Sequence, residues 1–89
     1  MLQHLVGVER ALQYKIYTGI DCIYCEMAKQ LLQEEGIEFK QMNLITREQQ
    51  QDFKALGFTT VPQVYDDEGN HIGGYNELAK KFKKTVYSL

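Results

Sequence analysis

The sequence has no tryptophan, a single proline and only two cysteines among its 89 residues. Two cysteines are too few for the disulfide framework of a small secreted protein, so the chain must fold around a hydrophobic core. An excess of basic residues is also missing: the formal net charge is −2, which argues against a dedicated nucleic-acid-binding protein. Because no apolar run could span a membrane and no secretory signal is evident, we expect a soluble, cytoplasmic protein.

Length and composition predict one small domain. Hydrophobic residues make up 44% of the chain and charged residues 25%, the balance of an ordinary folded protein. A chain of this length has no room for a flavin- or nicotinamide-binding domain, so any redox chemistry would need electrons from another molecule. We assign residues 14–89 to the domain. Residues 1–13 form an N-terminal extension, in which Leu2, Leu5 and Val6 indicate either a short amphipathic helix or a frayed terminus.

The pattern of apolar residues alternates between strand and helix. Strands are expected at residues 14–18, 37–44, 63–65 and 71–72, with a polar turn at 66–70. Helices are expected from about Cys22 to Gly36, from Thr46 to Gly57, and around the apolar stripe of Leu78, Ala79 and Phe82. The sequence from Thr46 to Gln49 has the form of a capping box, which would begin the second helix.

The resulting order is β-α-β-α-β-β-α, which defines the fold class as α/β. The first strand–helix–strand unit implies a right-handed crossover and therefore a parallel pair of strands. The segment 63–72 reads as a hairpin and adds antiparallel strands. We therefore expect a mixed four-stranded sheet with three helices on its faces.

Cys22 and Cys25 form a CxxC motif between the first strand and the first helix. Free N–H groups and the positive end of the helix dipole would stabilise a thiolate at Cys22 and lower its pKa. Cys25 would lie about one turn away, so Cys22 could attack a disulfide and Cys25 could resolve the mixed disulfide. Asp21 is a candidate N-cap, although its charge beside Cys22 would oppose thiolate formation.

Two other interpretations of the cysteine pair are open. A lone CxxC could be half of a zinc site, but the sequence has no second such pair, and His4 and His71 are far apart along the chain. Both cysteines could also be inert core residues, which their position at a helix start disfavours. We therefore predict redox chemistry and no metal site.

Four segments together resemble the glutaredoxin family. They are Ile16-Tyr17-Thr18, Cys22-Ile23-Tyr24-Cys25, Thr59-Thr60-Val61-Pro62-Gln63 and His71-Ile72-Gly73-Gly74-Tyr75, in the family's order and spacing. The resemblance covers about residues 14–84 and is strongest to the short bacteriophage-type glutaredoxins. It implies a thioredoxin-like fold, with Cys22 as the nucleophile and Cys25 as the resolving thiol.

The resemblance also implies a glutathione site. It would include Tyr24, Gln49, Thr60, Val61, Pro62, Gly74, Tyr75 and Asn76. The Val61–Pro62 bond would be cis, and the Val61 backbone could then pair with an extended ligand. The start of the last helix would hold the γ-glutamyl end of glutathione, although a simple turn with positive φ explains Gly73-Gly74 as well. The capping box is likewise an alternative explanation for Gln49.

Several positions depart from the family pattern. Gly19 stands where many glutaredoxins have lysine, Phe58 where arginine is frequent, and Asn76 where aspartate is common. Ile23 replaces the usual proline of the CPYC motif. Three charged contacts to glutathione are therefore missing or neutralised.

The resulting prediction is a monomeric, glutathione-dependent thiol–disulfide oxidoreductase in electron transport and cell redox homeostasis. Disulfide-containing proteins would be its substrates, and the resemblance suggests ribonucleotide reductase among them. Two alternatives are an electron carrier reduced by thioredoxin reductase and a glutathione-bridged [2Fe–2S] protein. Lys80, Lys81, Lys83 and Lys84 form a basic patch, which we interpret as a solvated face rather than a docking surface for an acidic partner.

Overall fold

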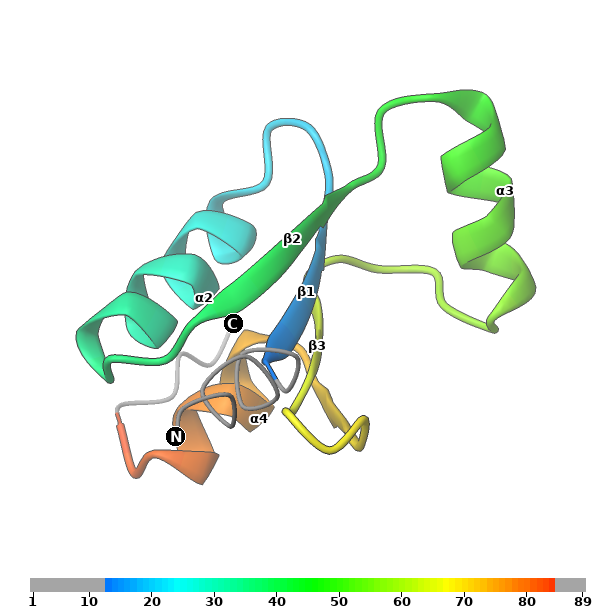
Figure 1. The fold of residues 1–89 in the computed structure, drawn as a ribbon. Helices are drawn as coiled ribbons and strands as arrows, with labels where there is room; N and C mark the ends of the chain where they lie inside the picture. The colour runs from blue at the N-terminus through cyan, green and yellow to red at the C-terminus, as the bar shows by residue number, and fades with distance from the viewer. Residues whose placement is uncertain (1–12, 85–89) are drawn as a thin grey trace, which may run out of the picture.

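The computed structural model describes residues 13–84 of the chain (Figure 1). Residues 1–12 and 85–89 lie outside the described residues, and so does most of the N-terminal extension considered above. Among the described helices, none is both long enough and apolar enough to cross a membrane.

The elements follow the predicted order. The strands are β1 (Tyr14–Thr18), β2 (Phe39–Asn43), β3 (Gln63–Tyr65) and β4 (His71–Gly73), and the helices are α2 (Ile23–Glu34), α3 (Arg47–Ala55) and α4 (Tyr75–Lys81). Strand β2 is shorter than the predicted 37–44. At its start, the Ile37 N–H donates to the Leu32 carbonyl at 2.9 Å and so belongs to the turn that ends α2.

The four strands form one mixed sheet in the order β2-β1-β3-β4. Strands β1 and β2 are parallel, with Ile16 opposite Gln41, as the crossover through α2 requires. Strand β3 runs antiparallel to β1 and to β4, and Ile16 also lies opposite Val64. The predicted parallel pair and hairpin are both confirmed, and the first cysteine follows the end of a central strand.

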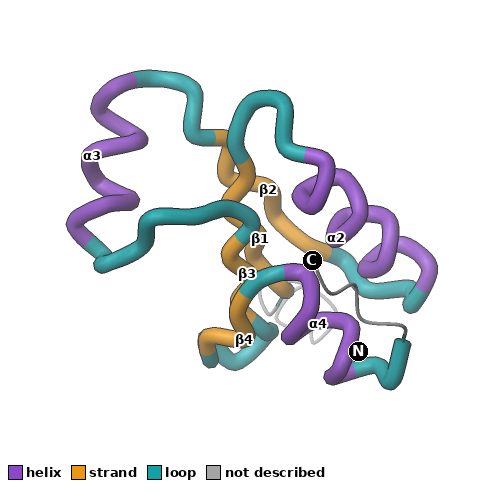
Figure 2. The backbone as a smooth tube through the Cα atoms, turned by 180° about the vertical axis from the view of Figure 1, so that it is seen from behind, coloured by secondary structure: helices purple, strands orange, loops and turns teal. Residues whose placement is uncertain are grey.

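Helices α2 and α4 cover one face of the sheet and α3 lies on the other (Figures 1 and 2). Because side chains alternate along a strand, Ile16 and its neighbours two residues away point into the core between the sheet and α2 and α4. The main members of this core are Tyr14, Ile16, Ala28, Leu31, Leu32, Val64, Leu78 and Ala79. The core therefore fixes α2, whose first turn carries the cysteines.

The α3 side of the sheet carries a cluster of rings, which we call the aromatic cluster: Tyr17, Phe53, Phe58, Tyr65 and His71. Phe53 of α3 lies 5.4 Å from Tyr17 between ring centroids and 5.3 Å from Phe58. His71 lies 5.0 Å from Phe58 and 5.1 Å from Tyr65. These contacts join α3 to β1, β3 and β4, and to the segment that leads into β3.

Asp66 organises the turn between β3 and β4. One carboxylate oxygen accepts from the backbone N–H groups of Glu68 and Asn70 at 2.9 and 2.8 Å. The backbone hydrogen bond from Asn70 is the largest cause that lowers the Asp66 pKa below its usual value, because it favours the charged form. The turn sets the register that brings His71 opposite Tyr65.

Candidate active site

Cys22 is the N-cap of α2. Its backbone is extended, with φ −115° and ψ 102°, and its sulfur accepts from the Cys25 N–H at 3.1 Å. The expectation that Asp21 caps the helix is wrong. Asp21 has a left-handed backbone, with φ 53°, whereas an N-cap residue is extended, so the chain turns at Asp21 and presents the next residue to the helix end.

The two cysteines are joined by a disulfide, with their Cα atoms 5.2 Å apart. Cys25 is completely buried, whereas Cys22 is only partly buried. A disulfide partner arriving from solvent therefore has better access to Cys22 than to Cys25. This difference in exposure is the one that an attacking Cys22 and a resolving Cys25 would need.

The segment before β3 lies against Cys22. The Val61 carbonyl oxygen is 3.8 Å from the Cys22 sulfur, and the Val61–Pro62 bond is cis, as the resemblance implied. On the other side, a Cβ added at Gly19 would lie 3.1 Å from a Val61 methyl. A side chain at residue 19 would therefore need the Val61 methyl to shift by a few tenths of an ångström.

The start of α4 approaches the same segment. A Cβ added at Gly74 would lie 3.5 Å from the Pro62 carbonyl oxygen, and Gly74 is the N-cap of α4. The Gly74 N–H donates to the Glu77 carboxylate at 2.9 Å. The chain therefore supplies its own carboxylate at the position where the sequence predicted a ligand carboxylate. Gly73 has φ 126°, so the positive φ proposed for this turn is present.

Tyr24 and Tyr75 connect α2 with α4 beside the cysteines. Their ring centroids are 6.1 Å apart, and both side chains are partly exposed. Asn76 follows in the first turn of α4 and is also partly exposed. The fold thus brings the cysteine loop, the segment around Val61 and the start of α4 together.

Gln49 has the capping role that its spacing predicted. Its side-chain oxygen accepts from the backbone N–H groups of Ile45 and Thr46, both at 2.9 Å, and the Thr46 hydroxyl accepts from the Gln49 N–H at 3.1 Å. The capping box of α3 is therefore complete. The contact between Gln49 and glutathione stays a prediction.

Sequence reasoning missed a set of side-chain hydrogen bonds that reaches the residue before Val61. The buried Gln63 side chain bonds to Thr60 and to His71. A signal was available, because strand alternation places Gln63 on the same face as Tyr65, and the hairpin puts His71 opposite Tyr65. Phe58, which stands in the position of the missing arginine, belongs to the aromatic cluster instead.

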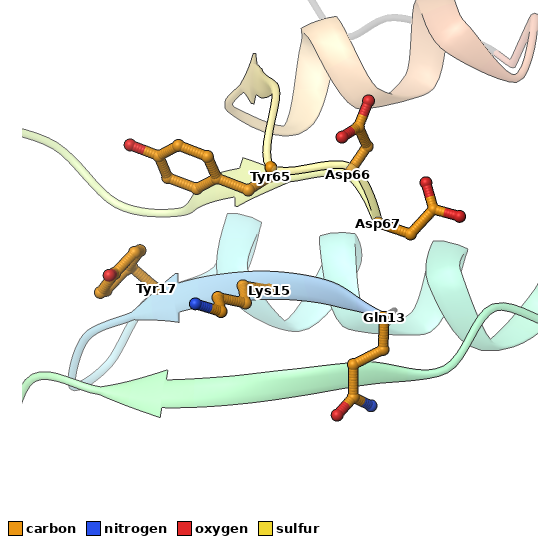
Figure 3. A pocket seen from close by; sticks show the side chains of 7 residues that line it. Gln13, Lys15, Tyr17, Tyr65, Asp66 and Asp67 are labelled. Atoms are coloured by element: carbon orange, nitrogen blue, oxygen red, sulfur yellow. The ribbon is translucent and has the colours of Figure 1, made fainter. Parts of the chain in front are cut away.

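A separate hollow of about 350 Å³ lies on the α3 side of the sheet (Figure 3). Lys15, Tyr17, Tyr65, Asp66 and Asp67 line it. Neither cysteine lies among its lining residues, and Tyr14, Ile16 and Val64 of the strands face the opposite side, toward the core. This hollow is thus distinct from the site of the cysteines.

The basic residues near the end of α4 are mostly exposed. Lys80 and Lys81 lie in the last turn of α4, where cations interact favourably with the helix dipole. Lys84 forms an ion pair with Glu35 at 3.2 Å, which links this end to the C-cap of α2. Three of the four lysines, Lys80, Lys81 and Lys84, therefore have favourable interactions within the chain.

Comparisons with known proteins show similarity to the glutaredoxin family. The glutaredoxin family model matches residues 15–72. Glutaredoxin 3 of Escherichia coli K12 is 41% identical over 68 residues, which cover 72% of this chain and 78% of that protein. A glutaredoxin of Pseudomonas aeruginosa is 40% identical over 65 residues, covering 71% of this chain and 76% of the relative.

Solved structures show the same fold. Glutaredoxin 1 from Francisella tularensis, complexed with cacodylate, aligns with a TM-score of 0.69 and 33% identity, covering 79% of this chain and 91% of its own. The buckwheat glutaredoxin–glutathione complex aligns with a TM-score of 0.72 over 89% of this chain and 78% of its own; at 24% identity it supports the fold alone. The thioredoxin-like architecture is therefore confirmed.

Proposed function

The chain belongs to the glutaredoxin family and is a thiol–disulfide oxidoreductase, and from this premise we propose that it reduces protein disulfides and glutathione mixed disulfides with glutathione as its reductant. The observation that carries the proposal is the position of Cys22. Its sulfur caps α2 and accepts the Cys25 N–H at 3.1 Å, and the residue is partly exposed, while Cys25 is fully buried. A helix N-terminus favours a thiolate and therefore activates Cys22.

The reaction proceeds in two exchanges. The Cys22 thiolate attacks one sulfur of a substrate disulfide, forms a mixed disulfide and releases the other substrate sulfur as a thiolate. The Cys25 thiolate then attacks the Cys22 sulfur, which releases the second substrate thiol and leaves the Cys22–Cys25 disulfide. One glutathione thiolate opens this disulfide by attacking Cys22, and a second one attacks the bound glutathione, so that oxidised glutathione leaves and the dithiol is restored.

Glutathione would lie across the three segments that meet at Cys22. The Val61 backbone, next to the Cys22 sulfur, would pair with the backbone of the tripeptide as an added strand. Thr60 and Pro62 shape that segment, and Gln49 would meet the glycine carboxylate. Tyr24 would flank the ligand, and the γ-glutamyl end would contact Gly74, Tyr75 and Asn76. The buckwheat glutaredoxin, which shares this fold, was solved as a complex with glutathione.

Glu77 favours a second candidate function. Its carboxylate accepts the Gly74 N–H, at the position proposed for the γ-glutamyl carboxylate of glutathione. A ligand carboxylate would have to displace it and would meet its charge. The alternative is a carrier that uses the same Cys22 and Cys25 chemistry but receives electrons from a thioredoxin reductase.

The test is turnover of a glutathionylated peptide with glutathione as reductant. We expect activity in the wild type and in Cys25→Ser, because a second glutathione can release the first from Cys22. We expect none in Cys22→Ser, because the nucleophile is gone. Serine is close to cysteine in size, so Cys25→Ser also serves as the matched control for the loss of a sulfur atom.

The same proteins distinguish the second candidate. If the wild type fails with glutathione yet reduces a protein disulfide with a thioredoxin reductase and its nicotinamide reductant, the glutathione proposal is wrong and the carrier is correct. Activity in Cys22→Ser would contradict both, since both depend on this nucleophile. Under both candidate functions, whether the electrons come from glutathione or from a thioredoxin reductase, the proposed physiological role is reduction of disulfide-containing proteins in the cytoplasm.

A further inference from the structure

The Gln63 side chain connects the segment beside Cys22 to the far edge of the sheet. Its amide nitrogen donates to the Thr60 carbonyl at 3.1 Å and to the Thr60 hydroxyl at 3.2 Å. Its amide oxygen lies 2.7 Å from Nε2 of His71. Gln63 itself is 8% exposed, whereas its partners Thr60 and His71 lie at the surface, so the bonds are partly buried.

The backbone carbonyl of Thr60 determines which group donates and which accepts in these hydrogen bonds. The Thr60 carbonyl can only accept, so the Gln63 group that faces it is the NH2, and the Gln63 oxygen therefore faces His71. Nε2 of His71 must then carry a hydrogen and donate it. Both the Nε2–H tautomer and the imidazolium ion meet this requirement, so the bond is compatible with either charge state of His71.

The His71 ring is itself held in place. It lies 5.0 Å from the Phe58 ring and 5.1 Å from the Tyr65 ring, within the aromatic cluster. Aromatic contacts of this geometry add stabilisation beyond the burial of their area. His71 is thus a fixed donor at the edge of the sheet, and Gln63 passes that constraint on to Thr60.

Thr60 immediately precedes Val61, whose carbonyl oxygen is 3.8 Å from the Cys22 sulfur. We propose that Gln63 and His71 are positioning residues, which hold the backbone of Thr60 and Val61 at the distance from Cys22 that an extended substrate needs. The inference rests on the proposed function, in which the Val61 backbone pairs with the bound substrate. Neither residue touches the sulfur, so their effect acts through Thr60.

The test compares two assays of the full chain. One is reduction of a glutathionylated peptide by glutathione, and the other is reduction of insulin disulfides with dithiothreitol, which uses no glutathione. In Gln63→Leu and His71→Phe we expect KM for the disulfide substrate to rise about tenfold in both assays, with kcat within about twofold of the wild type. His71→Phe keeps a ring in the aromatic cluster and removes only the donor.

Two further variants separate positioning from stability. His71→Gln restores a side-chain N–H donor without the ring, so KM should return toward the wild-type value. Phe58→Leu removes a ring from the aromatic cluster and keeps every hydrogen bond, so it should lower Tm and leave KM unchanged. Because His71 is exposed, His71→Phe tests the proposal even if Gln63→Leu fails to fold.

Wild-type KM values in folded His71→Phe would overturn the proposal, and so would an equal rise of KM in Phe58→Leu. If the wild type is inactive with glutathione but reduces insulin disulfides, only the glutathione proposal fails. The positioning role of Gln63 and His71 is then decided by KM in the insulin assay.

Discussion

At the scale of single residues, the proposed function gives the partly exposed Cys22 and the buried Cys25 different roles. The spacing of the CxxC motif and its place at a helix start together predicted this order of attack and resolution, because a helix start favours a thiolate at the first cysteine. The identity of the cap was wrong, because it depends on backbone angles. Asp21 is a common capping residue by composition, but its left-handed backbone leaves the extended cap position to Cys22.

Asp21 places a carboxylate in the residue immediately before the proposed nucleophile. We predict that Asp21→Asn lowers the pKa of the reduced Cys22 thiol, because it removes a negative charge from the residue next to the thiolate. Asparagine tolerates the left-handed backbone, so the loop should keep its shape. The measurement is the pH dependence of iodoacetamide alkylation in a Cys25→Ser background, which leaves a single thiol.

Glu26→Gln is the control for this prediction. Glu26 is another carboxylate near the cysteines, in the first turn of α2, but it is paired with Lys29 at 3.0 Å. Its neutralisation should therefore change the Cys22 pKa less than Asp21→Asn does. An unaltered Cys22 pKa in Asp21→Asn would contradict the prediction. It would mean that the N-terminus of α2, and not the charge of Asp21, determines the pKa of the Cys22 thiol.

At the scale of elements, α3 shows which hydrogen bonds can be predicted from a local sequence pattern. The capping box at Thr46 and Gln49 was predicted from four residues and is complete in the structure, because its hydrogen bonds are local. The bonds from Gln63 to Thr60 and His71 could not be predicted in this way. They depend on the register of β3 with β4, which is set by a turn and by packing.

The capping box also tests the proposed glutathione contact of Gln49. Thr46→Ala and Gln49→Ala should each reduce the free energy of unfolding by about 0.5–2 kcal/mol, because each removes half of the box. Only Gln49→Ala should also raise KM for glutathione, by about tenfold, since it deletes the amide that would donate to the glycine carboxylate. Chemical denaturation and steady-state kinetics of both variants provide the two measurements.

Thr46→Ala is the matched control, because it weakens the same helix end and leaves the Gln49 amide in place. Equal KM values in the two variants would mean that Gln49 acts only as a cap. The kinetic comparison therefore decides between the two interpretations that its sequence position allows.

At the scale of the whole molecule, one core connects the cysteine helix to the sheet. The order of elements and the mixed sheet were predictable, because apolar periodicity and short connections leave few arrangements. The position of the cysteines after the carboxyl end of the central strand β1 follows from that topology. The aromatic cluster on the α3 face was not predicted, because Phe53, Phe58 and His71 come from segments that only the fold brings together.

The core also sets an alkaline limit on stability through Tyr14. This residue is 9% exposed, and burial is the main cause that raises the pKa of its phenol above 10, followed by the charges of Asp67 and Asp66. Because the folded chain holds this proton more tightly than the unfolded chain, the stabilisation is complete below pH 10. It is lost as the pH rises through the raised pKa.

We therefore predict that Tm of the wild type falls more than Tm of Tyr14→Phe between about pH 9 and about pH 11, because phenylalanine fills the core without a proton to lose. Tyr17→Phe is the control, since Tyr17 is half-buried on the opposite face of the sheet and its loss removes the same number of phenols. Thermal denaturation of the oxidised proteins across this range makes the comparison. If all three lose Tm in parallel, the alkaline limit comes from the net charge of the whole chain and not from Tyr14.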